Sequence, residues 1–209
     1  ASNGKVVGVD HSEIMLRQAS RRNRAAIAAC RVQLHLASAA ALPPFSEPFD
    51  KVMASNVHMF LDDPVATLRR WLAITRPGGW VALQEVDWIS WVCDPIHPAW
   101  TKLLSINAEI WGKRGMDVFV GRRLPGFLKK AGLTDVQSKI HTPVYRNTHP
   151  YQFLLLAFSK INRTEMIEKG YVTEAEYTDL TESLHAHLSD SGTFVTWSLF
   201  CQAWGRKPA

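Results

Sequence analysis

The stretch Lys5-Val6-Val7-Gly8-Val9-Asp10 decides the fold, because it is a short apolar run that ends in an acid. Such a run is typical of a buried parallel strand with a functional group at its tip. Ser12 follows at once, and its hydroxyl is expected to cap a helix by accepting a backbone N–H near Ile14 or Met15. In this helix Met15 is expected to point inward. The opening segment therefore predicts the first strand and helix of an α/β unit.

Strand-like and helical patterns continue to alternate after this unit. A tight turn is expected at Pro77-Gly78-Gly79, because glycine accepts the positive φ that a turn demands. The other predicted elements of this part are strands at Val32 to Leu36, Phe49 to Ser55 and Trp80 to Val86, and a helix from Asp63-Pro64 through Thr75. This order predicts an α/β fold, a doubly wound and mostly parallel Rossmann-like sheet flanked by helices.

The second half of the chain changes character. Helices are expected at Ala99 to Trp111, Gly121 to Ala131, Tyr151 to Ile161 and Glu174 to Leu188, with an antiparallel edge strand at Asp135 to Tyr145 and a closing C-terminal strand at Thr193 to Trp204. We expect one domain over residues 1–209. Residues 1–88 would form its cofactor-binding half and residues 89–209 its substrate-side half.

Composition narrows the class of protein. The 209 residues are 46% hydrophobic and 21% charged, which is ordinary globular usage and argues against extended disorder. Three cysteines give an odd number without paired spacing, so we expect no disulfide scaffold and a reducing, cytoplasmic location. The longest strongly apolar run, Phe153 to Phe158, is far shorter than the ~18 residues of a membrane span. The net charge of +5 comes from scattered basic pairs, which favours nucleic acid as a partner only weakly.

Polar groups follow four of the predicted strands, at the edge where an open parallel sheet binds ligands. They are Asp10-His11, Ser38-Ala39, Asn56 to His58 and Glu85 to Trp88. A carboxylate at the position of Asp10 can accept two hydrogen bonds from a ribose diol, or it can merely help to cap the next helix. The spacing alone leaves both readings open.

The order of these motifs resembles the class I S-adenosylmethionine-dependent methyltransferases, of the small-molecule type common in bacteria. The resemblance covers residues 4 to 88, with a looser continuation at Gly121 to Pro125 and Trp204 to Pro208. It rests on Val7-Gly8-Val9-Asp10-x-Ser12-x-x-Met15-Leu16, Ala39-x-x-Leu42-Pro43, Phe49-Asp50-x-Val52, Leu61-x-Asp63-Pro64, Arg76-Pro77-Gly78-Gly79-Trp80 and the tip Glu85-Val86-Asp87-Trp88.

The resemblance implies that S-adenosylmethionine lies across the strand tips. Asp10 would hold the ribose hydroxyls, His11 would lie against the adenine face, and Met15 belongs to the same motif. Ser38 and Ala39 would meet the adenine edge, while Asn56 and Val57 would approach the methionine part. Catalysis would consist mainly of aligning the acceptor with the activated methyl group.

Two departures from the family pattern stand out. Serine occupies position 38, where the family usually has an acid, so its contact with adenine would be weaker. The glycine-rich loop Asp/Glu-x-Gly-x-Gly-x-Gly and the strand before it are absent. That strand would lie between the strand ending at Asp10 and the one starting at Phe49, so two apolar edges are expected to lack a partner. We expect the chain to be a fragment of a longer protein; alternatively another segment or chain fills the gap.

Candidate residues on the substrate side are His58, Glu85, Asp87 and Trp88. His58 could act as a general base on a substrate hydroxyl, although a packed histidine is the commoner outcome. Of Glu85 and Asp87, one is expected to face the cleft and the other to be structural. Trp88 and the tryptophans that follow it could line an apolar acceptor pocket or form a core.

The favoured function is therefore methyl transfer from S-adenosylmethionine to a small, partly apolar acceptor. The catalytic candidates are His58 and Glu85, and no metal site is expected, since Cys93 and His97 lack further ligands. A homodimer is conceivable, whereas membrane and nucleic-acid partners are not favoured. Two alternatives stay open: a non-catalytic remnant of the methyltransferase fold and, less favoured, a nicotinamide-dependent oxidoreductase.

Overall fold

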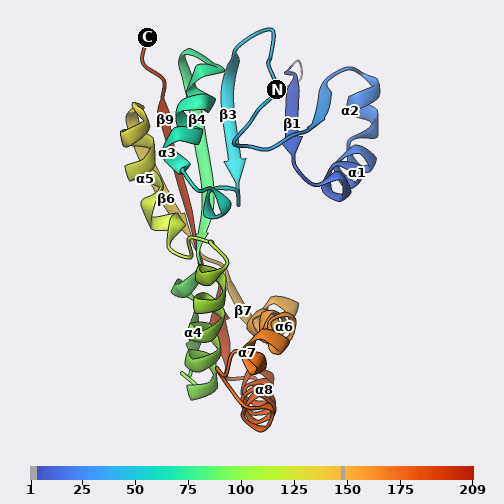
Figure 1. Ribbon diagram of the computed structural model, residues 1–209, viewed down its shortest axis with the longest axis vertical. Helices are drawn as coiled ribbons and strands as arrows, with labels where there is room; N and C mark the ends of the chain where they lie inside the picture. Colours follow the sequence, from blue (N-terminus) through green and yellow to red (C-terminus); the bar gives the residue numbers. More distant parts are fainter. Residues whose placement is uncertain (1–3, 147–148) are drawn as a thin grey trace.

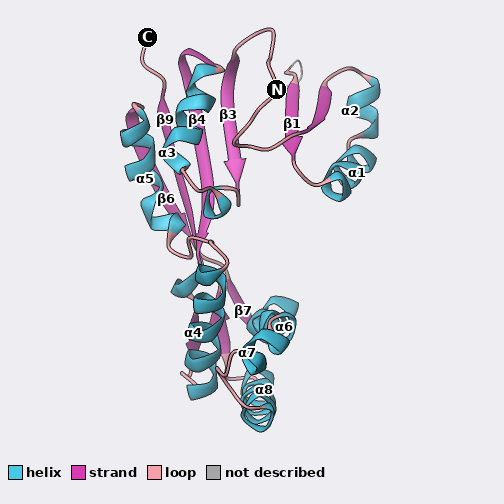
Figure 2. Ribbon diagram, viewed as in Figure 1, coloured by secondary structure: helices cyan, strands magenta, loops and turns pink. Residues whose placement is uncertain are grey.

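The computed structural model describes residues 4–146 and 149–209, and the chain forms two lobes that are stacked along the long axis of the molecule (Figure 1). Three separate sheets are present in the described residues. One sheet is mixed, one is parallel and one is antiparallel, and the helices packed on them make this an α/β protein (Figure 2). No helix of the described part is long and apolar enough to cross a membrane.

The main sheet lies in the first lobe and has the strand order β3-β4-β9-β6. Its strands are β3 (Phe49–Ser55), β4 (Thr75–Asp87), β9 (Leu199–Arg206) and β6 (Thr134–His141). β3 and β4 are parallel, whereas β9 is antiparallel to both β4 and β6. The predicted strand at residues 49–55 is confirmed, and β6 is the antiparallel edge strand that the sequence predicts.

The predicted turn at residues 77–79 lies inside β4. The register shifts there, from Phe49 opposite Thr75 to Lys51 opposite Trp80, so the intervening residues bulge out of the strand. Gly78 has a φ of +69°, which is the positive value that the sequence predicts for this segment. The turn is therefore present as a bulge and does not separate two elements.

Two helices cover one face of the main sheet (Figure 1). They are α3 (Pro64–Ala73) and α5 (Val120–Ala131). The side chain of Asp63 caps α3 by accepting the N–H of Ala66 at 2.8 Å, and α5 ends at Gly132 with a φ of +102°. Leucines from both helices fill the space against the sheet: Leu68, Leu124 and Leu128 are fully buried. Burial of this apolar face holds the lobe together.

The first residues form a unit of their own beside the main sheet. It contains β1 (Val6–Asp10) paired in parallel with β2 (Val32–Leu36), together with α1 (Glu13–Arg22) and α2 (Arg24–Ala28). Ser12 caps α1 as predicted, accepting the N–H of Met15 at 3.4 Å. The expected inward position of Met15 is wrong, because the side chain is 49% exposed on a helix with no buried residue.

β1 and β3 are not hydrogen-bonded to each other. β1 pairs only with β2, and β3 pairs only with β4, so each strand has one edge without a strand partner in the described residues. This gap agrees with the expectation from the missing glycine-rich segment. In Figure 1 the two strands lie side by side, with the gap between them.

The second lobe contains a three-stranded antiparallel sheet with the order β5-β8-β7, packed against helices. Its elements are β5 (Val92–Asp94), α4 (Pro98–Lys113), β7 (Val144–Arg146), α6 (Leu154–Ile161), α7 (Arg163–Glu168), α8 (Glu174–Ser189) and β8 (Phe194–Thr196). The described part of the chain also contains three short 3-10 helices: η1 (His58–Phe60), η2 (Trp88–Ser90) and η3 (Pro150–Phe153).

Two strands that the sequence predicts as continuous are divided between the lobes. The expected strand at residues 193–204 becomes β8 in the second lobe and β9 in the first, and the one at residues 135–145 becomes β6 and β7. Between the predicted helices that end at Ile161 and begin at Glu174, the structure has a further helix, α7. The two hydrophobic cores do not correspond to residues 1–88 and 89–209. Elements α5, β6 and β9 come from the second range but pack in the first lobe.

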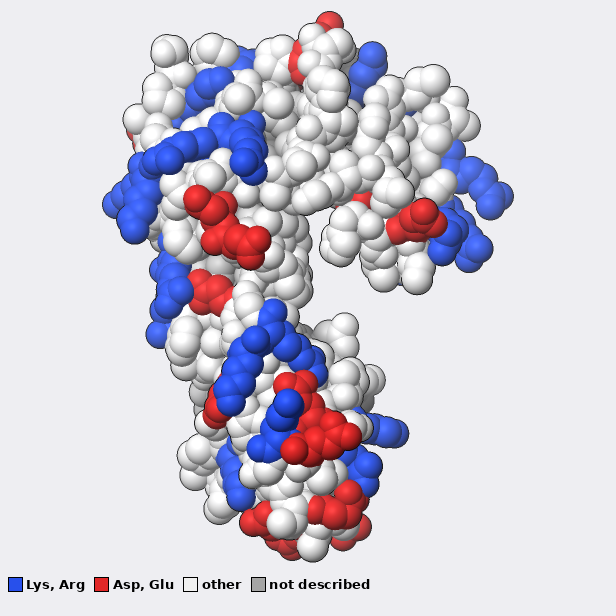
Figure 3. Space-filling model, viewed as in Figure 1, with Lys and Arg blue, Asp and Glu red and all other residues white. Residues whose placement is uncertain are grey.

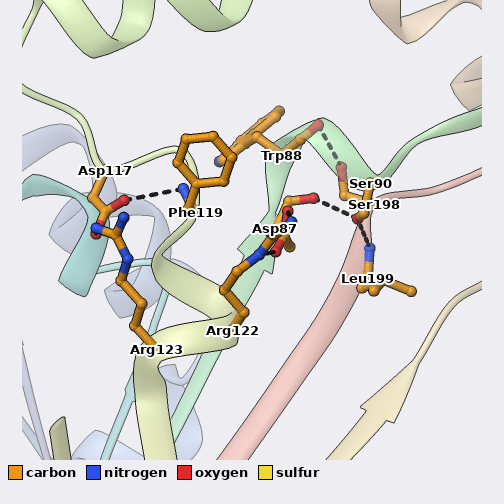
Figure 4. A network of polar contacts seen from close by, with 9 residues as sticks. All are labelled: Asp87, Trp88, Ser90, Asp117, Phe119, Arg122, Arg123, Ser198 and Leu199. Carbon is orange, nitrogen blue, oxygen red and sulfur yellow. Dashed lines mark hydrogen bonds and ion pairs between the residues drawn. The ribbon is translucent and has the colours of Figure 1, made fainter. Parts of the chain in front are cut away.

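Helix α5 lies very close to β4, and Gly121 makes this approach possible. A Cβ atom at this position would lie 3.0 Å from the backbone of both Val86 and Asp87. Beside it, Arg122 forms a two-pronged ion pair with Asp87, in which its Nη2 donates to Oδ1 at 3.0 Å and its Nε donates to Oδ2 (Figure 4). The Asp87 side chain is 2% exposed, whereas that of Arg122 is 55% exposed. The ion pair raises the pKa of Arg122.

We predict that Gly121→Ala lowers the free energy of unfolding by about 1–3 kcal/mol, because the new methyl group overlaps backbone atoms that cannot move aside. Gly126→Ala is the matched control. It lies in the same helix with no atom within 4 Å of its Cβ position, so it should stabilise by about 0.5–1 kcal/mol. Urea unfolding followed by circular dichroism measures both, and equal stability of Gly121→Ala and the parent would contradict the close approach.

A second prediction concerns the ion pair. Arg122→Gln leaves the buried carboxylate of Asp87 without its cation and should lower the free energy of unfolding by about 2 kcal/mol, a value reduced by the exposure of Arg122. Arg123→Gln breaks a more exposed pair with Asp117 on the same helix and should cost less than ~1 kcal/mol. Similar losses in the two variants would show that the buried carboxylate does not depend on Arg122.

Candidate functional site

A cavity of about 280 Å³ lies between the unpaired edges of β1 and β3. Three residues that the sequence assigns to the cofactor, Asp10, Ala39 and Val57, line it. The rest of its wall is largely apolar: Val7, Val9, Leu42, Phe45, Phe49, Lys51, Val52, Met53, Ala54, Ser55, Trp71 and Ile74. The strand gap and the predicted cofactor site are therefore the same region of the molecule.

Asp10 keeps one carboxylate oxygen available at this cavity. Its Oδ1 accepts the N–H of Ser12 at 2.8 Å, and Oδ2 has no partner among the described residues. The side chain is 40% exposed. One oxygen thus orders the start of α1, as the capping interpretation predicts, and the ribose interpretation stays a prediction for the other oxygen.

The loop after β2 is anchored by helix α3. The indole N–H of Trp71 donates to the carbonyl of Ala39 at 2.8 Å, and Arg70 donates to the carbonyl of Ala40 at 2.8 Å. Ser38 closes the loop by accepting the N–H of Ala40 at 3.2 Å. These contacts hold Ala39 at the cavity wall, although no strand joins this unit to the main sheet.

The turn after β3 is fixed by Glu85, whose side chain is fully buried. Its Oε1 accepts the N–H groups of Val57 at 2.7 Å and His58 at 2.6 Å. Asn56, just before them, has a φ of +54°, in the left-handed region that asparagine tolerates best among the non-glycine residues. The turn places Val57 at the cavity and leaves the Asn56 side chain exposed.

The expected catalytic roles of His58 and Glu85 need correction. Both side chains are fully buried, and His58 packs edge-on against Trp71 at 5.1 Å between ring centroids. Within residues 4–146 and 149–209, the ring nitrogens of His58 and the Oε2 of Glu85 have no hydrogen-bond partner. His58 Nδ1 lies 3.6 Å from Glu85 Oε1. In this position neither group reaches an acceptor molecule, because both are sealed beneath the turn after β3.

Asp87 and Trp88 also differ from their expected substrate-facing roles. Asp87 is buried and bound to Arg122, so neither acid of this strand end faces an open cleft. Glu85 and Asp87 are two residues apart and therefore leave the strand on the same face, toward α3 and α5. Trp88 is partly buried in an aromatic cluster of the second core with Trp91, Trp111, Phe158 and Trp197.

Four residues assigned to the cofactor are exposed and do not line the cavity: His11, Met15, Ser38 and Asn56. The ring of His11 is 88% exposed, with its Nδ1 3.8 Å from Asp10 Oδ1. Sequence reasoning missed Trp71, which lines the cavity and holds Ala39. Its signal was a buried-looking helix position carrying an indole N–H that needs an acceptor.

A second pocket, of about 510 Å³, opens beside α4; we call it the α4 pocket. Its lining contains no charged residue: Ile89, Trp91, Val92, Cys93, Ile96, Trp100, Thr101, Leu104, Ser105, Ala108 and Phe119. Burial raises the pKa of the Cys93 thiol to about 11, so this group is also neutral at pH 7. The pocket is close in the chain to the end of β4, because Ile89 directly follows Trp88.

A backbone contact also connects the α4 pocket to the turn after β3. The N–H of Asp117, two residues before Phe119, donates to the carbonyl of Met59 at 3.0 Å. Trp88 in turn donates its N–H to the carbonyl of Val118 at 3.0 Å. The β3 turn, the β4 end and one wall of the α4 pocket are therefore joined by hydrogen bonds.

Comparisons with known proteins agree with this geometry. Residues 1–79 match the family model of the methyltransferase domain. An uncharacterised methyltransferase of Schizosaccharomyces pombe is 31% identical over 129 residues, which are 59% of this chain and 46% of that protein. The N-methyltransferase tcpN of Claviceps purpurea is 26% identical over 145 residues, 65% of this chain and 50% of that protein. The chain spans about half the length of these relatives.

Solved structures share the fold at low sequence identity. A methyltransferase-like protein of Bacillus halodurans matches with a TM-score of 0.59 and 14% identity, covering 98% of this chain and 84% of that one. Phosphoethanolamine N-methyltransferase 2 of Haemonchus contortus, solved with phosphomonomethylethanolamine and S-adenosylhomocysteine, matches with a TM-score of 0.55 and 18% identity, covering 98% and 44%. Residues 1–79 thus match the methyltransferase-domain family, and the fold of the whole chain is the one that these solved methyltransferase structures share.

Proposed function

We propose that the protein transfers a methyl group from S-adenosylmethionine to a small, uncharged and largely apolar acceptor. The observation that carries the proposal is Asp10: its carboxylate lies at the tip of β1, lines the cavity and keeps one oxygen without a partner among the described residues. A ribose diol is the ligand group that such an acceptor suits, because hydroxyl groups donate to a carboxylate in charge-assisted bonds.

The residues that line the cavity, Asp10, Ala39 and Val57, and exposed residues next to them suit the parts of this cofactor. Asp10 would accept from the ribose hydroxyls, His11 would cover the adenine face, and Ala39 with Ser38 would meet the adenine edge. Asn56 and Val57, on the turn after β3, would approach the methionine part. When bound, S-adenosylmethionine supplies a methyl group on a positively charged sulfur, ready for transfer to a nucleophile.

The chain's own contribution to the rate would be orientation. The carboxylate of Glu85 and the imidazole of His58 are sealed under the turn, so they would act on the reaction by holding backbone in place. Holding an acceptor in line with the methyl group can contribute ~7–11 kcal/mol of the barrier reduction in favourable cases. This is a mechanism in which rigid walls matter more than proton transfer.

The α4 pocket supports an uncharged acceptor. Its volume of about 510 Å³ suits a small organic molecule. With no charged residue in its lining, burying a phosphate, carboxylate or ammonium group there would leave the charge unpaired, which is costly. The hydroxyls of Thr101 and Ser105, one turn apart on α4, could bind a single polar group of such a molecule.

We also propose a cytoplasmic location and a small molecule, not nucleic acid, as the partner. Three free cysteines, Cys30, Cys93 and Cys201, support a reducing compartment such as the cytoplasm. On the face drawn in Figure 3, Lys and Arg lie in separate groups over both lobes, with Asp and Glu between them. This distribution suits a small-molecule acceptor better than nucleic acid, which a continuous basic surface would favour.

Calorimetry with S-adenosylhomocysteine tests the cofactor. We expect binding, and we expect Asp10→Asn to weaken it about tenfold, because the variant keeps an acceptor for Ser12 but loses the charge. Asp50→Asn is the control: it removes an exposed carboxylate that pairs with Arg76 and does not line the cavity. Heat with NAD alone would favour an oxidoreductase, and heat with neither ligand a non-catalytic remnant.

Transfer of labelled methyl groups to a panel of acceptors tests the acceptor class. We expect neutral phenols and aromatic alcohols to be methylated faster than phosphoethanolamine or free amino acids. Ala108→Trp, which fills part of the α4 pocket, should raise the acceptor KM at least tenfold and leave the KM of S-adenosylmethionine within twofold. Preference for charged acceptors, or an unchanged acceptor KM, would exclude the α4 pocket as the acceptor site.

A further inference from the structure

The end of strand β3 is unusual in how its backbone is satisfied. Pairing with β4 runs to Ser55 opposite Gln84, and the N–H of Asn56 still donates to the carbonyl of Gln84 at 2.9 Å. The next two N–H groups, of Val57 and His58, leave the ladder and converge on one oxygen of the Glu85 side chain. Where β3 turns away from the sheet, the Glu85 side chain of β4 thus accepts the N–H groups that the backbone of β4 no longer reaches.

This arrangement buries a carboxylate at considerable cost. Glu85 is fully buried, and no Lys or Arg of the described residues lies within ion-pair distance of it; His58, at 3.6 Å, is the nearest basic group. A buried carboxylate of this kind persists only if its hydrogen bonds offset the loss of hydration. The two short N–H contacts do so, and they would be lost together if the carboxylate were removed.

The bound turn connects two walls of the cavity. Glu85 holds the backbone of His58, the His58 ring packs against Trp71, and the Trp71 indole donates to the carbonyl of Ala39. Val57 and Ala39 both line the cavity, one on each side of this chain of contacts. A shift of the turn would therefore alter both walls.

We infer that Glu85 is a positioning residue of the methyltransferase site. Its carboxylate holds the turn after β3 so that Val57 presents a preformed wall to the cofactor. Through His58 and Trp71 it also sets the position of Ala39. The expected effect of Glu85 on cofactor binding rests on the proposed function. The holding of the turn itself is a property of the unliganded protein.

Two variants separate the accepting oxygen from the rest of the side chain. Glu85→Gln keeps an oxygen for the two N–H groups, whereas Glu85→Leu removes it at similar size. Amide hydrogen exchange of residues 56–60 in the unliganded protein should accelerate at least tenfold in Glu85→Leu and less than threefold in Glu85→Gln. S-adenosylhomocysteine affinity should fall at least tenfold in Glu85→Leu, with Glu85→Gln restoring most of it.

Asn107→Leu is the matched control for general destabilisation. It breaks a fully buried polar network with Ser159 and Asn162 in the second lobe, far from the turn in the fold. It should lower the melting temperature while exchange at residues 56–60 and cofactor affinity stay within twofold of the parent. If Glu85→Leu does not fold, Glu85→Asp, which draws the carboxylate back by one methylene, should give the same accelerated exchange.

The outcomes distinguish this inference from the proposed function. Unchanged exchange at residues 56–60 in Glu85→Leu or Glu85→Asp overturns the holding of the turn. Equal losses of affinity in the Leu, Gln and Asn107 variants overturn a positioning role and leave only a structural one. If the parent protein binds no S-adenosylhomocysteine, the proposed function and the consequence for the cofactor fail, while the exchange data still decide whether Glu85 holds the turn.

Discussion

The burial of two carboxylates at the end of β4 is the constraint on which the rest of this structure depends. Glu85 and Asp87 leave the strand on one face, and each must find hydrogen-bond donors there, because an unpaired buried charge is strongly unfavourable. Glu85 finds them in the backbone after β3, and Asp87 finds them in Arg122 of α5. The turn after β3, at the proposed cofactor site, and the helix that covers the sheet are thus fixed to one strand end.

The same strand end joins the two lobes. Beyond Asp87, Ser90 donates to the carbonyl of Asp87 and accepts the N–H of Leu199, while Ser198 donates to the carbonyl of Trp88 (Figure 4). Trp88 itself belongs to the aromatic cluster of the second core. An acceptor pocket beside α4 and the wall of the proposed cofactor site would therefore both be fixed to the end of β4. Alignment of two substrates requires such a common fixed position.

Local signals made most of the fold predictable, and long-range pairing accounts for what was missed. The strand at Phe49–Ser55, the helix start at Asp63-Pro64 and the helix end at Ala131 follow from nearby residues, and the structure has all three. The bend at residues 197–198, which divides β8 from β9, depends on hydrogen bonds to Ser90 and Trp88, which are more than 100 residues away. For the same reason a strand-tip acid such as Glu85 looks catalytic in the sequence, since its actual partners lie 27 and 28 residues earlier.

A cofactor bound at the proposed site, in the gap between β1 and β3, would also have a structural role. β1 and β2 form a two-stranded sheet, which alone is marginally stable, and the loop beyond it is held to the main lobe by side chains of α3 rather than by strand pairing. A ligand held by Asp10 on one side and by Val57 on the other would bridge this gap. Because it would bind only when the two parts are correctly placed, its binding energy would add to their stability. The proposed cofactor site would then lie at the gap that strand pairing leaves unjoined. The turn after β3 would be the fixed side of this site, and the unit of β1 and β2 would be held against it by the ligand.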